Sequence, residues 1–233
     1  MTRYAPLLVA FACAVCALPS HAQTQSASQP QSASQPQSSP TATTAPAPKN
    51  GVPSPLTVKG KFRYFARESF RPGVWAVAGI YTGIEMAHPP RTYPPEWRQG
   101  VGGFARNYGD FMASWTAVQG GKFVVAAATH EDPRYSPSTR SGLMPRSLHA
   151  LKFVFIDHSD SGKNRLALSN FAGAAAGGFV GNAYLPDGYN DPSHAYTRSA
   201  LALSGFLTSN LADEFHPEIV RIAHKLHIPF VGK

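Results

Sequence analysis

The stretch NFAGAAAGGFVGNAY, residues 170–184, has the spacing of a helix but contains four glycines. Each glycine lowers the stability of a helix by about 1 kcal/mol relative to alanine. Gly173, Gly177 and Gly181 recur every fourth residue, whereas Gly178 falls off this row. Residues four apart form one row along a helix, and a row without side chains lets another helix approach closely. The spacing therefore predicts close packing of helices.

Rows of small residues with the same spacing occur in two other segments. They are Ala105, Gly109, Ala113, Ala117, Gly121 and Ala200, Ser204, Thr208, Ala212. The segments between Pro-, Gly- and Asp-rich turn signals are also longer than ordinary strands. We therefore expect an all-α fold, a compact bundle of about five to six helices with small-xxx-small packing. The expected helix-packing positions are Gly109, Gly173, Gly177 and Gly181.

The N-terminal region divides into two segments that precede the expected helical domain. Residues 1–22 combine Arg3, an apolar run and the small-residue motif Ser20-His21-Ala22, which is the pattern of a secretory signal peptide. Residues 23–55 are rich in Ser, Gln, Pro and Ala and predict a disordered linker. Residues 56–233 then form one helical domain. We expect an exported protein, located in the periplasm or associated with the outer envelope.

Charge and cysteine content narrow the function classes. Both cysteines, Cys13 and Cys16, lie in the predicted signal peptide, so the mature chain is expected to have no disulfide and no cysteine-ligated metal. The formal net charge is +8. For an exported protein, this positive charge favours an anionic lipid or membrane surface over nucleic acid as the partner. The sequence indicates no cofactor and no metal, and it identifies no protein partner.

The segment VKGKFRYFARESFRPG, residues 58–73, combines basic and aromatic side chains. Its basic residues recur every fourth position, at Lys59, Arg63, Arg67 and Arg71. Phe62, Phe65 and Phe70 lie on the adjoining face at helical spacing. This pattern is typical of a helix that lies on an anionic membrane surface. The alternative is a surface helix whose phenylalanines pack on the core of the domain itself.

The motif HEDPRY, residues 130–135, is the densest polar cluster. His130, Glu131 and Asp132 are candidate catalytic residues, since these types supply metal ligands and general bases. The structural alternative is that Pro133 ends a helix and that Glu131 and Arg134 pair or cap it. No metalloprotease, nucleophile-elbow, phosphate-loop or dinucleotide spacing is present.

Four segments resemble a family of exported bacterial proteins whose activity is uncharacterised. They are EWRQGVGGFARNYGD, HEDPRYSPSTRSG, PRSLHAL and RLALSNFAGAAAGGFVGNAYLPD. The resemblance covers about residues 61–224, and HEDPRY is its most specific element. It implies no activity or ligand, but it implies that the linker is dispensable to the fold. The sequence favours a non-enzymatic envelope protein that associates with lipid. The alternatives are a periplasmic hydrolase built on the HEDPRY residues and a soluble protein-interaction scaffold.

Overall fold

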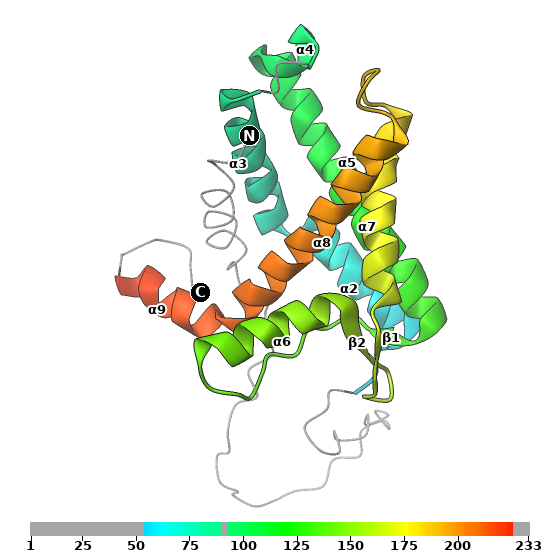
Figure 1. The fold of residues 1–233 in the computed structure, drawn as a ribbon, viewed down its shortest axis with the longest axis vertical. Coiled ribbons are helices and arrows are strands. Elements are labelled where there is room, and N and C mark those ends of the chain that lie inside the picture. The colour runs from blue at the N-terminus through cyan, green and yellow to red at the C-terminus, as the bar shows by residue number, and fades with distance from the viewer. Residues whose placement is uncertain (1–53, 90–92, 226–233) are drawn as a thin grey trace, which may run out of the picture.

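The computed structural model describes residues 54–89 and 93–225. The predicted signal peptide, and the predicted linker up to residue 53, lie outside the described residues. The helices are α2 Val58–Phe70, α3 Pro72–Ala87, α4 Pro95–Arg98, α5 Gly100–Thr129, α6 Leu143–Phe155, α7 Leu168–Val180, the 3-10 helix η2 Gly181–Ala183, α8 Pro192–Glu214 and α9 His216–Lys225 (Figure 1). The prediction of an all-α fold is therefore confirmed, although a small sheet accompanies the helices.

Local signals set several helix boundaries. The Asp191 carboxylate accepts hydrogen bonds from the backbone N–H groups of Ser193 and His194, and Pro192 occupies the first turn of α8. Thr57 caps α2 in the same way, with its hydroxyl 3.1 Å from the backbone nitrogen of Gly60. These caps satisfy N–H groups that a helix cannot pair internally.

Helix α7 lies between α5 and α8 and contacts both (Figure 1). The buried residues Val118, Val154, Ala174 and Phe206 form a core cluster that joins α5, α6, α7 and α8. Helices α2 and α3 pack against α5 instead. The long helix α5 is thus shared by two sets of helices. Among the described residues, no helix combines the length and the apolar character needed to cross a membrane.

The glycines of α7 explain how it fits between two neighbours. A Cβ atom at Gly173 would lie 2.8 Å from the carbonyl oxygen of Val118 in α5, and one at Gly177 would lie 3.0 Å from that of Ser114. Both distances are shorter than an ordinary contact. Both glycines are buried, and the backbones of α5 and α7 approach closely as the four-residue spacing predicted.

Two details of the packing prediction are wrong. Gly178 is also a contact position, because a Cβ atom there would lie 2.6 Å from the carbonyl oxygen of Ala195 in α8. Conversely, no described atom outside the backbone of α5 itself lies within 4 Å of a Cβ placed at Gly109, so this exposed glycine packs against no helix. Gly121, in the same row, does contact α7, at Gly173 and Ala176. Gly181 packs against Leu185 and Arg198.

A small antiparallel sheet closes the C-terminal end of α5. Its strands are β1 Glu131–Asp132, β2 Ile156–Ser159 and β3 Asn164–Leu166, in the order β1-β2-β3. Asp132 pairs with His158, and Asp157 pairs with Arg165. The Asp-, Gly- and Ser-containing segment DHSDSGKN, residues 157–164, has the composition of a turn between helices. It is instead a hairpin whose turn includes Gly162 at φ 78°, a conformation that glycine adopts without strain. This hairpin positions the site described next.

Candidate functional site

His130 occupies an unusual backbone position at the end of α5. Its φ and ψ are 58° and 38°, and it is the only residue other than glycine with positive φ in the described part of the chain. Its N–H donates to the carbonyl of Ala126, which ends the helix. The imidazole is 79 % exposed. The residue therefore directs the chain from α5 into β1 and leaves its ring in solvent.

Glu131 lies on the opposite side of the strand, in the interior. It is fully buried and accepts hydrogen bonds from the Thr129 hydroxyl at 2.8 Å and from the backbone N–H of Ser169 at 2.9 Å. Ser169 belongs to the first turn of α7, where the helix dipole is positive. The carboxylate thus caps α7 and ties it to the end of α5.

Asp132 is fixed by its own neighbour in the motif. Its carboxylate accepts from the Arg134 guanidinium at 2.6 and 2.9 Å and from the Arg134 backbone N–H at 3.1 Å. Arg134 also donates to the carbonyl of Ser54 at 2.8 Å. The structure therefore gives His130, Glu131 and Asp132 three separate sets of contacts and does not bring them to a common point.

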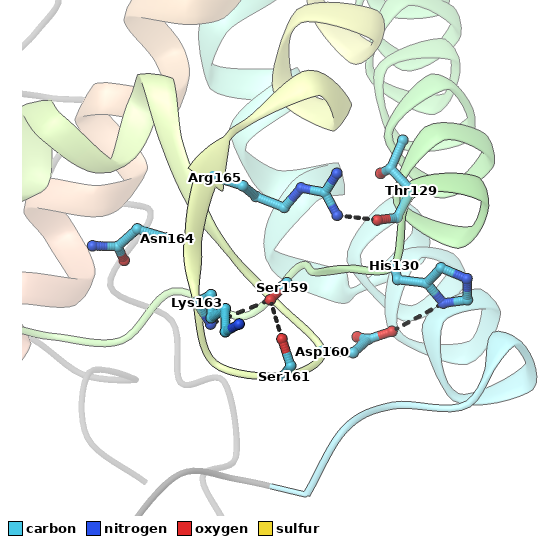
Figure 2. Close-up of a pocket in the computed structure, with 8 residues that line it drawn as sticks. All are labelled: Thr129, His130, Ser159, Asp160, Ser161, Lys163, Asn164 and Arg165. Carbon is cyan, nitrogen blue, oxygen red and sulfur yellow. Dashed lines mark hydrogen bonds and ion pairs between the residues drawn. The ribbon is translucent and has the colours of Figure 1, made fainter.

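A polar pocket lies where the end of α5 meets the β2–β3 hairpin (Figure 2). Its volume is about 490 Å³. The lining residues are all polar: Thr129, His130, Ser159, Asp160, Ser161, Lys163, Asn164 and Arg165. Among these, the sequence pointed to His130 as a candidate catalytic residue, and to Asp160 only as part of DHSDSG, which was interpreted as a capping turn. The cluster of basic and hydroxyl residues in SDSGKNR was the available signal.

Asp160 is the acidic residue of this pocket, and Lys61 neutralises it. The Lys61 ammonium lies 2.8 Å from the Asp160 carboxylate and 3.1 Å from the carbonyl oxygen of Ala126. Lys61 is buried, so this contact fixes α2 against α5 and the hairpin. The Nδ1 atom of His130 lies 3.6 Å from the same carboxylate oxygen of Asp160.

The hairpin is held rigidly against the helix. The Arg165 guanidinium donates to the carbonyl of Thr129, as Figure 2 shows. The hydroxyls of Ser159 and Ser161 lie 2.8 Å apart, and the backbone N–H of Lys163 donates to Ser159 at 3.2 Å. These contacts hold the Arg165 side chain and the backbone of Lys163.

A second polar cluster surrounds the buried Glu214 at the end of α8. Its carboxylate accepts from the Tyr135 hydroxyl at 2.7 Å, from the backbone N–H of Ser138 at 2.9 Å and from the Arg146 guanidinium at 3.2 Å. Burial alone would raise the pKa of Glu214, but these hydrogen bonds together lower it. Tyr135 also lies 3.1 Å from Nδ1 of His149. Because every group is paired, the cluster fastens the HEDPRY loop to α6 and α8.

Asp157, on β2, is a partly buried acid near the core. Burial raises its pKa to about 7, against a lowering effect of the His158 backbone N–H, which donates to it at 2.8 Å. Lys122 also lowers it, and burial in turn lowers the pKa of Lys122. The Lys122 ammonium lies 4.6 Å from the centre of the Phe206 ring. In the ranges that the structure describes, no group of three or more His, Cys, Asp or Glu side chains is arranged to hold a metal.

The predicted membrane-surface residues divide between the exterior and the interior. Five lie on the exposed face of α2: Lys59, Phe62, Arg63, Arg67 and Phe70. Phe65 is buried and meets Phe123 with ring centres 6.2 Å apart, so its assignment to the membrane surface is wrong. Arg71 ends α2 and lies 3.3 Å from Glu68. Packing on the domain therefore accounts for Phe65. Phe62 also meets Phe123, with ring centres 5.5 Å apart, but most of its surface stays exposed, as does that of Phe70.

Helix α3 also carries exposed apolar side chains. Its buried residues, Val74, Ala78 and Thr82, form one narrow row. Its large exposed apolar residues are Trp75, Ile80, Tyr81 and Ile84. Exposed apolar side chains on adjacent helices indicate an interaction surface.

Comparison of the chain with known protein families, with curated proteins and with solved structures gives no match.

Proposed function

We propose that this chain is an exported cell-envelope protein that binds an anionic membrane surface through the exposed face of α2. The observation that carries the proposal is the composition of that face. Phe62 and Phe70 are 56 % and 58 % exposed, and Lys59, Arg63 and Arg67 lie between and beside them. The one acidic residue of α2, Glu68, lies off this face, beside Arg71.

The expected affinity follows from these residues. Each basic residue near an anionic surface contributes about 1 kcal/mol, so Lys59, Arg63 and Arg67 together contribute about 3 kcal/mol. The exposed halves of Phe62 and Phe70 contribute roughly 1 kcal/mol each when they enter the interface. A total of about 5 kcal/mol corresponds to a dissociation constant of a few tenths of a millimolar in accessible lipid. Binding is therefore weak and reversible.

Sedimentation with vesicles tests the proposal. We expect the protein to pellet with vesicles that contain phosphatidylglycerol but not with pure phosphatidylcholine, and to be released by salt. The double variant Arg63→Glu/Arg67→Glu removes about 2 kcal/mol of attraction and adds repulsion, so its binding should fall at least about 30-fold. A protein that never pellets with anionic vesicles would contradict the proposal.

A matched control separates this face from the overall positive charge. Arg221 and Lys225 are also four apart and exposed, on α9. The variant Arg221→Glu/Lys225→Glu changes the net charge by the same amount, and it should retain most of the binding. Equal losses in the two double variants would show that binding follows the net charge rather than α2.

A further inference from the structure

We propose that the pocket between the end of α5 and the β2–β3 hairpin binds a phosphate group. This inference is independent of the lipid surface on α2. The pocket lining contains no apolar side chain, and its volume of about 490 Å³ is in the range of small-ligand sites. Every lining residue carries a polar or charged group, so charge and hydrogen bonds are available to hold a small polar ion.

The charge of the lining favours an anion. Lys163 and Arg165 are positive at neutral pH. The opposing charge is that of Asp160, and the buried Lys61 ammonium at 2.8 Å neutralises it. Figure 2 places the Arg165 guanidinium and the His130 ring on the α5 side of the pocket, and Ser159 and Ser161 on the hairpin side.

The donors are sufficient for a phosphate. Arg165 uses one guanidinium nitrogen for the carbonyl of Thr129 and retains further N–H donors. Guanidinium and ammonium groups are the usual protein partners of phosphate oxygens. The hydroxyls of Ser159 and Ser161 bond to each other, and one hydroxyl hydrogen of this pair remains free for a ligand.

The backbone of His130 provides a separate observation. A left-handed conformation at this position is adopted most easily by Gly or Asn, so terminating α5 does not require histidine. The imidazole is 79 % exposed and contributes little to packing. His130 thus places an exposed imidazole at the pocket rim beside Asp160, where it is accessible to a ligand.

Calorimetric titration tests the proposal. The ligands are sodium phosphate and glycerol 3-phosphate, and sodium chloride at equal ionic strength is the reference. We expect saturable binding of both phosphates with a submillimolar dissociation constant. Lys163→Gln should weaken it at least fivefold. His130→Asn keeps the backbone conformation accessible, so it should weaken binding at least threefold without lowering the melting temperature.

Arg140→Gln is the control, because Arg140 is exposed in the loop before α6 and lies outside the pocket. It should leave phosphate binding unchanged. No saturable binding by the parent protein, or an equal loss in Arg140→Gln, would overturn the proposal. The variant Arg63→Glu/Arg67→Glu should still bind free phosphate, so failure of the lipid proposal is distinguishable from failure of this one.

A second experiment distinguishes a lipid headgroup from a soluble phosphate ester as the ligand. It measures how Lys163→Gln and the parent bind vesicles of phosphatidic acid, whose headgroup is a phosphomonoester. It then compares the result with their binding of free glycerol 3-phosphate. A loss in both arms assigns the pocket to a lipid headgroup, and a loss only with the free ester assigns it to a soluble phosphate ester. A loss in neither arm contradicts the phosphate site.

Discussion

Gly178 is the position where one added methyl group should disturb the fold most. A Cβ atom there would lie 2.6 Å from the carbonyl oxygen of Ala195 and 2.7 Å from the backbone nitrogen of Ser199. Both are backbone atoms of α8, so no rotation of a side chain relieves the contact. Ordinary contact begins at 3.4 Å. Helix α8 must therefore move away from α7 by roughly 0.8 Å, which disturbs the dense packing between them.

The expected cost of Gly178→Ala follows from two opposing terms. Overpacking in a dense interior costs about 1 to 3 kcal/mol, and contact with an immobile backbone places this site at the upper end. Replacing glycine by alanine inside a helix gains about 1 kcal/mol. The net destabilisation is then about 2 kcal/mol, which lowers the melting temperature of a domain of this size by about 4 to 8 °C.

Gly109→Ala isolates the helix-propensity gain, because no neighbouring element lies near a methyl group there. It should stabilise the protein by up to about 1 kcal/mol, or about 2 to 4 °C. Gly177→Ala should fall between the two, since its nearest backbone contact in α5, at 3.0 Å, is less severe. Urea unfolding followed by circular dichroism measures all three. If Gly178→Ala is as stable as Gly109→Ala, the close crossing of α7 and α8 is refuted.

Two further changes test the interior carboxylates. Glu131→Gln removes the charge that caps α7. It should lower the free energy of unfolding by about 2 kcal/mol, because hydrogen bonds to charged groups contribute about 1.5 to 3 kcal/mol. An unchanged urea midpoint would show that this charge does not stabilise the fold. Burial raises the pKa of Asp157 from 3.8 to about 7, so the folded protein holds a proton that the unfolded chain releases. Stability should therefore fall as the pH rises from about 4 to 7, and Asp157→Asn should flatten this fall; identical pH profiles of variant and parent would exclude Asp157 as the cause.

The helices could be predicted because their signals are local. Proline and Asp191 mark the start of α8, and small residues at every fourth position mark the face of α7 that meets α5. The second neighbour of α7 could not be predicted in this way. Gly178 lies outside the four-residue row, and only the three-dimensional position of α8 makes it a contact. The prediction that Gly109 is a helix-packing position was wrong for the same reason, because the spacing of small residues does not show whether another helix lies beside them.

The site was harder to predict because its partners are distant in the sequence. His130 belongs with Asp160 and Lys61, from β2–β3 and α2, rather than with its neighbours Glu131 and Asp132. A strand alternates its side chains, so adjacent residues in β1 face opposite sides. The role of Lys61 could not be predicted, because a lysine in a basic helix is expected on the surface and not as the buried partner of an acid.

The glycine content of α7 also affects the order in which the chain can acquire its structure. An isolated helix of 13 residues is marginal in water, and one with so many glycines is weaker still. Helix α7 therefore becomes stable only when α5 and α8 are both available to enclose it. During synthesis, α8 emerges after α5 and α7, since it begins at Pro192. The central helix should stay unstructured until then, which delays cooperative folding until the segment that begins at Pro192 has emerged.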